Sequence, residues 1–264
     1  MREHNGSDVA ANGPSSSLTS DAHYYEGQDL EALSILPAYQ EWILERFRPH
    51  LRGKVIEIGA GLGNISARYA DLVQELLLLE PAQNLESRLR QRFEDRPNVR
   101  VCSALIETLH ADIAALPGAY GAPFDTALMV NVLEHVADDA SMLGYVHGAL
   151  RPRGALLLFV PACPWAYGTL DEKVGHLRRY TLGGLARLVQ SAGFSIETIR
   201  YFDLLGLLPW FFEGRIRKAV SFSPRLATLY DRILVPFARA MERHVTPPVG
   251  KNLLCIARSN GSTR

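Results

Sequence analysis

A glycine-rich turn between a predicted strand and a predicted helix is the part of the sequence best suited to bind a ligand. The apolar run Lys54–Ile58 contains Glu57 and is followed by glycines at positions 59, 61 and 63. Glycine lets the backbone turn sharply, and it lets a ligand approach without a Cβ in the way. In an open parallel sheet such a turn lies at the carboxyl edge, where ligands bind. We therefore expect a ligand site at the end of this strand.

The spacing of the glycines and the charge beside them favour a cationic ligand over a dinucleotide. A dinucleotide fingerprint needs the pattern G-x-G-x-x-G, whereas Gly63 comes one residue early and is followed by Asn64. The carboxylate of Glu57 would repel a pyrophosphate and attract an ammonium or sulfonium group. An NAD-dependent oxidoreductase is therefore the less favoured interpretation.

A second carboxylate follows the next predicted strand, residues 76–79. Glu80 stands 17 residues after Gly63. A carboxylate at the end of a strand can accept both hydroxyl protons of a ribose, and such charge-assisted hydrogen bonds are strong. The simpler interpretation is a solvated acid at a strand end. Together with the glycine turn, Glu80 favours a ribose contact.

Short apolar runs alternate with helical patterns along the chain. Strands are predicted over residues 54–58, 76–79, 99–102, 126–130, 155–160, 196–202 and 252–257. Helical patterns cover residues 30–47, with a new helix beginning at Pro37, and residues 64–72, 84–93, 137–150 and 181–191. Strands that are apolar on both faces and separated by helices indicate a parallel sheet covered on both sides. We expect one doubly wound, Rossmann-like α/β domain.

The domain organisation follows from the segments outside this pattern. Residues 1–22 are expected to be a disordered tail without a secretory signal, and residues 23–50 an N-terminal helical lid. Residues 51–203 and 250–258 form the predicted core. Residues 204–249 are too long for a plain connection and are expected to be a helical insertion that caps the substrate site.

Composition excludes several classes of protein. The 28 basic and 28 acidic residues among 264 give no net charge, which argues against a nucleic-acid-binding protein. Three cysteines without a CxxC pair exclude a disulfide scaffold and a cysteine-based zinc site, and they suit a cytoplasmic protein; we predict no metal. The longest apolar stretch, 204–212, is shorter than the roughly 20 residues that cross a bilayer. Peripheral contact with a membrane surface stays open, as does the oligomeric state.

Four segments in order, residues 57–63, 78–81, 124–136 and 150–161, resemble the class I S-adenosylmethionine (SAM)-dependent methyltransferases. The resemblance covers most of residues 29–258. It implies a seven-stranded sheet whose last strand is antiparallel, with SAM as cofactor and S-adenosylhomocysteine (SAH) as product. It assigns to the cofactor Glu57, Gly59, Ala60, Gly61, Gly63, Asn64, Glu80, Pro81, Asn131 and Leu133, with Glu134 as a further candidate for the floor below the sulfonium.

One stretch departs from the family pattern. After the third strand such enzymes usually carry an acidic residue that receives the adenine amino group, whereas this chain has Ser103, Ala104 and Leu105. We expect the backbone of Ala104 and Leu105, or the hydroxyl of Ser103, to hold the adenine instead.

A polar loop after the fifth strand, residues 170–181, is the predicted substrate side. Its His176 is the first candidate for a general base, and His135 is the second, although His135 is also interpreted as a structural bridge. Arg178, Arg179 and Tyr180 are predicted either to contact the substrate or to anchor the loop. This loop and residues 250–254 resemble type 11/12-like methyltransferases found beside glycosyltransferases or in natural-product pathways.

Aromatic residues outside this loop complete the prediction. Tyr24 and Tyr25 are candidates for a lid over the sulfonium, or they dock the terminus. Trp210, within the insertion, is a candidate for the wall of the substrate pocket, or it simply packs the cap onto the sheet.

We predict methyl transfer to an oxygen or nitrogen of a small-molecule acceptor, mainly by proximity and with a possible histidine base. Natural products, sugars and lipid-linked intermediates remain open, and the alternative is a non-catalytic SAM-binding protein.

Overall fold

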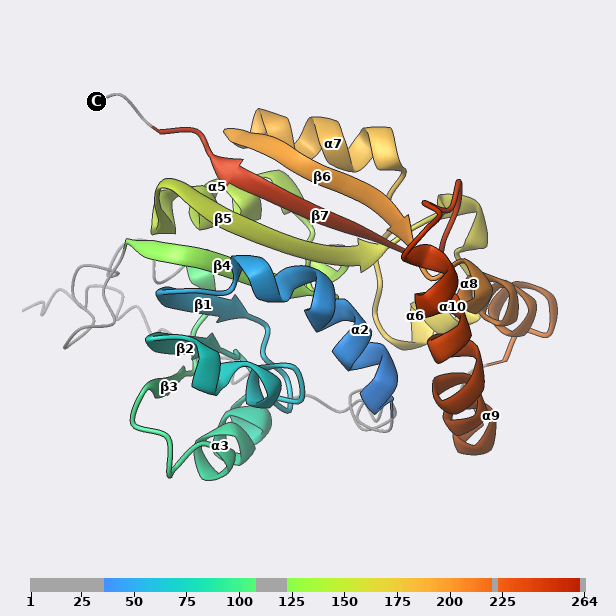
Figure 1. Cartoon of the computed structure of the whole chain (residues 1–264), viewed down its shortest axis with the longest axis horizontal. Coiled ribbons are helices and arrows are strands. Elements are labelled where there is room, and N and C mark those ends of the chain that lie inside the picture. The colour runs from blue at the N-terminus through green and yellow to red at the C-terminus, as the bar shows by residue number, and fades with distance from the viewer. Residues whose placement is uncertain (1–35, 108–122, 220–222, 262–264) are drawn as a thin grey trace, which may run out of the picture.

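Seven strands form one mixed sheet in the described part of the computed structural model (Figure 1). They are β1 (Lys54–Ile58), β2 (Glu75–Leu79), β3 (Val99–Cys102), β4 (Phe124–Val130), β5 (Leu150–Pro161), β6 (Phe194–Phe202) and β7 (Asn252–Ser259). The strand order is β3-β2-β1-β4-β5-β7-β6, and β7 runs antiparallel to both of its neighbours. The predicted fold, with its antiparallel last strand, is confirmed.

The structure describes residues 36–107, 123–219 and 223–261. The predicted disordered tail, residues 23–35 of the predicted lid, and with them the lid candidates Tyr24 and Tyr25, lie outside the described residues. The predicted division into tail, lid, core and cap therefore stays a prediction.

Alternating side chains of the strands build a hydrophobic core on each face of the sheet. In β5, Leu156 and Leu158 belong to one core, whereas Leu157 and Phe159 belong to the other. The first core packs against α5 (Asp139–Ala149) and α7 (Leu182–Ser191), and the second against α2 (Pro37–Phe47) and α10 (Val235–Glu242). The sheet is thus covered on both faces, as its apolar runs predicted.

The first described helix, α2, begins at Pro37, as predicted. Its fixed φ suits the first helical turn, where the missing N–H costs nothing. Trp42 is fully buried on this helix and stacks on Phe202 of β6 with ring centroids 4.0 Å apart. The helix is therefore held on the sheet by a large aromatic contact.

The helix predicted over residues 64–72 forms only as two short 3₁₀ turns, Ser66–Arg68 and Ala70–Leu72. Tyr69 lies between them with φ −130°, outside the helical region, and its side chain is fully buried. This residue interrupts the helix because its ring points into the core below β1.

Helices also make up the insertion, as predicted. Its elements are α8 (Leu204–Phe211), a π-helical turn Phe212–Ile216, α9 (Pro224–Leu229), a second π-helical turn Tyr230–Leu234, and α10. The buried carboxylate of Asp231 accepts hydrogen bonds from the backbone N–H groups of Ala38 (3.0 Å) and Tyr39 (2.9 Å). The insertion is thereby fastened to the start of α2 and lies at the carboxyl edge of the parallel strands (Figure 1).

The remaining helices are short connectors or cover the edges of the sheet. They are α3 (Gln83–Arg92), α6 (Thr169–Lys173) and the 3₁₀ turns Arg48–His50, Leu133–His135 and Pro164–Ala166. Within the described ranges, no helix has both the length and the apolar character needed to cross a bilayer.

Candidate active site

The glycine turn after β1 needs glycine for its own geometry. Gly59, Gly61 and Gly63 have φ values of +70°, +56° and +70°, which L side chains rarely adopt. A Cβ on Gly59 would lie 2.6 Å from Val132 Cγ2, and one on Gly63 would lie 2.8 Å from Leu89 Cδ2. The turn therefore lies at the carboxyl edge of the sheet and packs tightly, with Gly59 half-buried and Gly61 and Gly63 buried. The contact of this turn with the methionine part of SAM stays a prediction.

Glu80 joins the end of β2 to the glycine turn. Its buried carboxylate accepts hydrogen bonds from Gly61 N (2.8 Å) and Ala82 N (3.1 Å). Burial raises the pKa of Glu80, and these two backbone hydrogen bonds oppose that rise. Each carboxylate oxygen can accept more than one hydrogen bond, so lone pairs remain for the hydroxyls of a ribose. Glu80 thus combines a structural link with an acceptor suited to the nucleoside.

Glu57 is buried at the end of β1, where Tyr69 Oη donates a hydrogen bond to its Oε2 at 2.6 Å. Burial raises the pKa of Glu57 to about 7, although hydrogen bonds from Tyr69 and Ser66 act in the opposite direction. Tyr69 was not predicted as a site residue. An aromatic residue within a helical pattern carries no local sign that it will bond to a strand residue.

Replacing Glu57 by glutamine should change how stability depends on pH. The pKa of Glu57 is about 7 in the folded chain against an ordinary 4.5, so the folded state binds the proton more tightly. The stabilisation from this proton is complete below the ordinary pKa and is lost as pH rises through 7. Relative to the wild type, Glu57→Gln should gain about 3 kcal/mol between pH 4.5 and pH 8. Urea unfolding at several pH values measures this difference. Parallel pH curves for Glu57→Gln and the wild type would contradict the prediction.

The predicted adenine residues lie beside Glu80. Ser103, Ala104 and Leu105 follow β3 directly, and Cys102 at its end pairs with Leu79 of β2. Ser103 and Leu105 are exposed and Ala104 is half-buried, so this edge is open to a ligand. Their contacts with adenine stay a prediction.

Pro81 and Asn64 lie at the margins of the predicted cofactor site. Pro81 is half-buried next to Glu80. The Oδ1 atom of Asn64 accepts a hydrogen bond from Arg92 Nη1 at 2.9 Å, and the same nitrogen donates to Leu62 O at 2.8 Å. Asn64 therefore helps to fasten α3 to the glycine turn, and its contact with the cofactor stays a prediction.

The predicted floor follows β4. Asn131 has φ +53°, an uncommon value for a residue other than glycine, and its N–H donates to Phe159 O at 2.8 Å. Leu133, two residues later, is fully buried. A residue other than glycine held at positive φ often marks a functional position, because the surrounding structure must maintain this unfavourable conformation.

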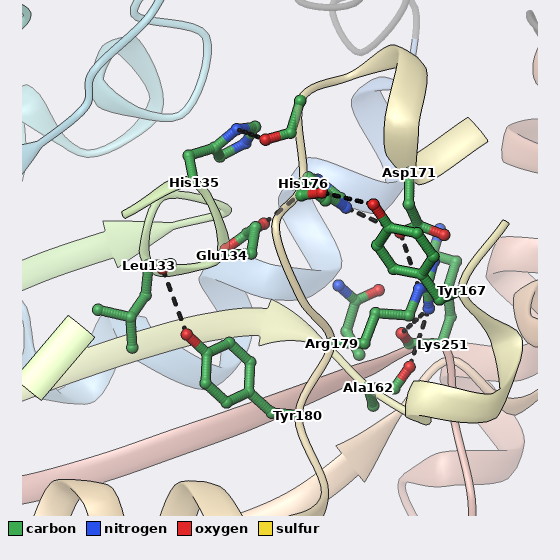
Figure 2. Close-up of polar contacts among 12 residues, drawn as sticks. Leu133, Glu134, His135, Ala162, Tyr167, Asp171, His176, Arg179, Tyr180 and Lys251 are labelled. Carbon is green, nitrogen blue, oxygen red and sulfur yellow. Dashed lines mark hydrogen bonds and ion pairs between the residues drawn. The ribbon is translucent and has the colours of Figure 1, made fainter. Parts of the chain in front are cut away.

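Asp171 organises the polar loop that follows β5 (Figure 2). Its carboxylate is fully buried and accepts hydrogen bonds from Arg179 Nε at 2.8 Å and Gly168 N at 3.1 Å. Burial by itself would raise the pKa of Asp171, but the hydrogen bond with His176 and the charge of Arg179 lower it below its ordinary value. Asp171 is thus an ionised carboxylate at the base of the loop.

His176 lies between two buried acids (Figure 2). Its Nδ1 is 2.8 Å from Asp171 Oδ1, and its Nε2 is 3.6 Å from Glu134 Oε1. Because an ionised carboxylate only accepts hydrogen bonds, we assign the proton to Nδ1, which leaves a lone pair on Nε2. This pairing of carboxylate and imidazole is the arrangement that orients a general base.

Glu134 is fully buried below His176, in the 3₁₀ turn after β4. Neither carboxylate oxygen accepts a hydrogen bond from another described residue, and burial raises the pKa of this group to about 8. An acid buried without such a partner is costly, which indicates a functional use. The sequence placed Glu134 near the floor but did not predict its proximity to His176.

His135 connects the turn after β4 to the loop. Its Nδ1 is 3.1 Å from Gly175 O, and its ring centroid is 4.9 Å from that of His176. Burial of the ring and the neighbouring His176 lower the pKa of His135 to about 4. This geometry supports the interpretation of His135 as a structural bridge and not as a proton acceptor.

Donor atoms of Glu134, His135 and His176 lie within 4.8 Å of one another, close enough to hold a cation.

The other predicted substrate residues of the loop are engaged with the protein. The side chain of Arg179 is 1% exposed and donates from Nη1 to Ala162 O at 2.9 Å. Arg178 pairs with Asp139 at 2.9 Å, and Tyr180 Oη donates to the same carboxylate at 2.9 Å. These contacts anchor the loop, which was the alternative interpretation. Substrate contact by the three residues stays a prediction.

Trp210 brings the insertion into this site. Its Nε1 donates to Asp171 Oδ2 at 3.3 Å, and its ring lies 5.1 Å from the guanidinium of Arg179. Lys251, whose Nζ lies 3.2 Å from Asp203 Oδ2, is 6.0 Å from the centroid of the same ring. The insertion and the His176 loop are therefore one connected unit at the carboxyl edge of the sheet.

Comparison with known proteins agrees with this geometry. A family model described as a methyltransferase domain matches residues 56–156. A protein of Mycolicibacterium smegmatis named for SAM-dependent methyltransferase activity is 25% identical over 195 residues, covering 70% of this chain and 72% of the relative.

Solved structures agree on the fold. A SAM-dependent methyltransferase from Mesorhizobium loti is similar with a TM-score of 0.55 at 19% identity, covering 83% of this chain and 97% of that one. The N-methyltransferase NodS from Bradyrhizobium japonicum, solved with SAH, has a TM-score of 0.52 at 12% identity, covering 84% and 85%. The strand order and the solved structures show the class I methyltransferase fold. The methyltransferase domain matched over residues 56–156 and the relative from Mycolicibacterium smegmatis support a SAM-dependent methyltransferase, an enzyme that uses SAM as its cofactor.

Proposed function

We propose that this enzyme methylates an oxygen or nitrogen atom of a small acceptor and that His176 accepts the acceptor's proton. Bound SAM supplies an electrophilic methyl group on a sulfonium. The glycine turn would hold the methionine part, and Glu80 would hold the ribose. Asn131 and Leu133 would then lie near the sulfonium, within reach of the loop that carries His176.

The pairing of Asp171 with His176 carries the proposal. A hydroxyl of the acceptor would give its proton to Nε2 of His176 while an oxygen lone pair takes the methyl group. A protonated amine would first give a proton to Nε2 and then attack with the lone pair that this frees. In both cases the electrons of the carbon–sulfur bond would stay on sulfur, which leaves SAH. Asp171 stabilises the resulting imidazolium through Nδ1–H, at 2.8 Å. Alignment of acceptor and methyl group supplies most of the rate enhancement, and the base adds to it.

Apolar side chains near the loop support an acceptor that is partly apolar. Trp165, 54% exposed after β5, contacts Phe211 of α8 with ring centroids 5.4 Å apart. This pair lies on the segments that border the His176 loop. A natural product, or a sugar carried on an apolar group or lipid, would match such a wall better than a small free sugar.

Incubation with methyl-labelled SAM and four classes of acceptor tests this function. The classes are hydroxylated polyketides, free sugars, lipid-linked saccharides and amines. We expect label on an oxygen or nitrogen of a partly apolar acceptor. Label on carbon, or on free sugars alone, would contradict the proposal.

We also propose a cytoplasmic location. Cys102, Cys163 and Cys255 are all free thiols, and the last two are buried. Thiols of this kind suit a reducing compartment.

A further inference from the structure

Exposed apolar side chains concentrate on the insertion. Nine large apolar residues of this segment are between 38% and 67% exposed: Leu208, Phe212, Ile216, Leu226, Leu229, Ile233, Leu234, Phe237 and Val245. Elsewhere in the described ranges only Leu72, Leu105, Trp165 and Leu177 are comparably exposed. Such a concentration marks an interaction site, because soluble proteins rarely expose large apolar patches.

The exposed residues follow the helical repeat and lie opposite the buried face. Leu229, Ile233 and Phe237 recur every four residues from α9 into α10. Val235 and Ala238 of the same segment are fully buried in the core. The helix is therefore amphipathic, with one face fixed to the protein and the other left apolar toward solvent. Leu208, Phe212 and Ile216 repeat this spacing along α8 and the π-helical turn that follows it.

Basic residues accompany this apolar face. The side chains of Arg215, Arg217, Lys218, Arg225 and Arg232 are exposed. The acids of the insertion offset only one of them: Asp231 and Glu242 are buried, and Glu213 pairs with Arg217 at 3.1 Å. We call the nine apolar and five basic side chains the insertion surface.

The positive charge of the insertion surface indicates which kind of partner it binds. Two copies placed face to face would bring like charges together, which disfavours a symmetric dimer through this surface. Apolar side chains flanked by arginine and lysine are instead the pattern of helices that lie in the interface of an anionic bilayer. No described helix needs to span the bilayer for this kind of contact.

We propose that the insertion surface docks the enzyme on an anionic lipid bilayer. The apolar side chains enter the headgroup region, and the basic side chains contact lipid phosphates. Since Trp210 of α8 donates to Asp171 at 3.3 Å, docking would bring the His176 loop close to the membrane. The docking itself does not depend on the proposed acceptor or base.

Flotation of the full chain with lipid vesicles tests this proposal. Vesicles of phosphatidylcholine with 30% phosphatidylglycerol should carry the protein, pure phosphatidylcholine vesicles should carry at least about 10-fold less, and salt should release it. The triple variant Phe212→Ser, Ile233→Ser, Phe237→Ser should lower the bound fraction at least about 10-fold. The triple variant Arg215→Glu, Arg225→Glu, Arg232→Glu should remove the preference for anionic vesicles.

Controls separate docking from folding and from catalysis. Leu72→Ser removes an exposed apolar side chain outside the insertion and should leave flotation unchanged. Calorimetric SAH binding should be the same in every variant, because none touches the cofactor site. Flotation that ignores lipid charge or both triple variants would overturn the proposal. So would a dimer in light scattering that the serine variant dissociates, since it would assign the surface to a second copy.

Discussion

Replacing His176 by alanine should lower kcat by about 10²–10⁴-fold, the usual contribution of a positioned general base. The affinity for SAH should change little, because we propose that His176 contacts the acceptor and not the cofactor. The side chain is held by Asp171 at 2.8 Å and faces Glu134 at 3.6 Å, so alanine removes the acceptor of the proton and leaves both acids in place. Steady-state kinetics with the acceptor found by labelling, together with calorimetry, measures both quantities.

Two further variants show whether the fall in kcat comes from the loss of proton transfer to His176. His176→Gln can still hydrogen-bond Asp171, so it should keep the melting temperature of the wild type and be as slow as alanine. His135→Ala removes the neighbouring ring, 4.9 Å away, and should affect kcat far less. Normal turnover of His176→Ala, or a larger loss in His135→Ala, would contradict the assignment of His176 as the base.

Much of the fold could be predicted because it rests on local patterns. The runs in β1, β2 and β5 are apolar on both faces, which only a sheet covered on both sides can bury. The glycine turn also followed from residue types and spacing, since its positive φ values require glycine. The antiparallel β7 came from the family resemblance, because periodicity does not determine the direction of a strand.

The contacts of the site depend on tertiary structure and were harder to predict. Tyr69 lies 12 residues from Glu57, and nothing in its helical pattern shows that it leaves the helix to reach this acid. Asp171 and His176 were part of one predicted polar loop, but a loop has no fixed period from which their pairing could be derived. Trp210 joins Asp171 across 39 residues, through the fold of the insertion.

Replacing Glu80 by alanine should weaken SAH binding by about 10²-fold. A hydrogen bond to a charged group contributes about 1.5–3 kcal/mol, and two ribose hydroxyls would together give about 3 kcal/mol or more. The carboxylate also accepts from Gly61 N at 2.8 Å and Ala82 N at 3.1 Å, so alanine disturbs the glycine turn as well. Calorimetry with SAH measures the total loss of affinity. The part due to the disturbed glycine turn must then be separated from the part due to the lost ribose hydrogen bonds.

An SAH analogue without the ribose hydroxyls makes that separation. The wild type should bind the analogue about 10²-fold more weakly than SAH, because Glu80 loses its two charge-assisted partners. Glu80→Ala should bind SAH and the analogue nearly equally, since the group that distinguishes them is gone. Lys54→Ala, on the amino end of β1 away from the glycine turn, is the matched control and should keep the wild-type discrimination. If Glu80→Ala weakened both ligands by the same factor, the carboxylate would serve the turn alone, and the ribose contact would have to be assigned to another residue.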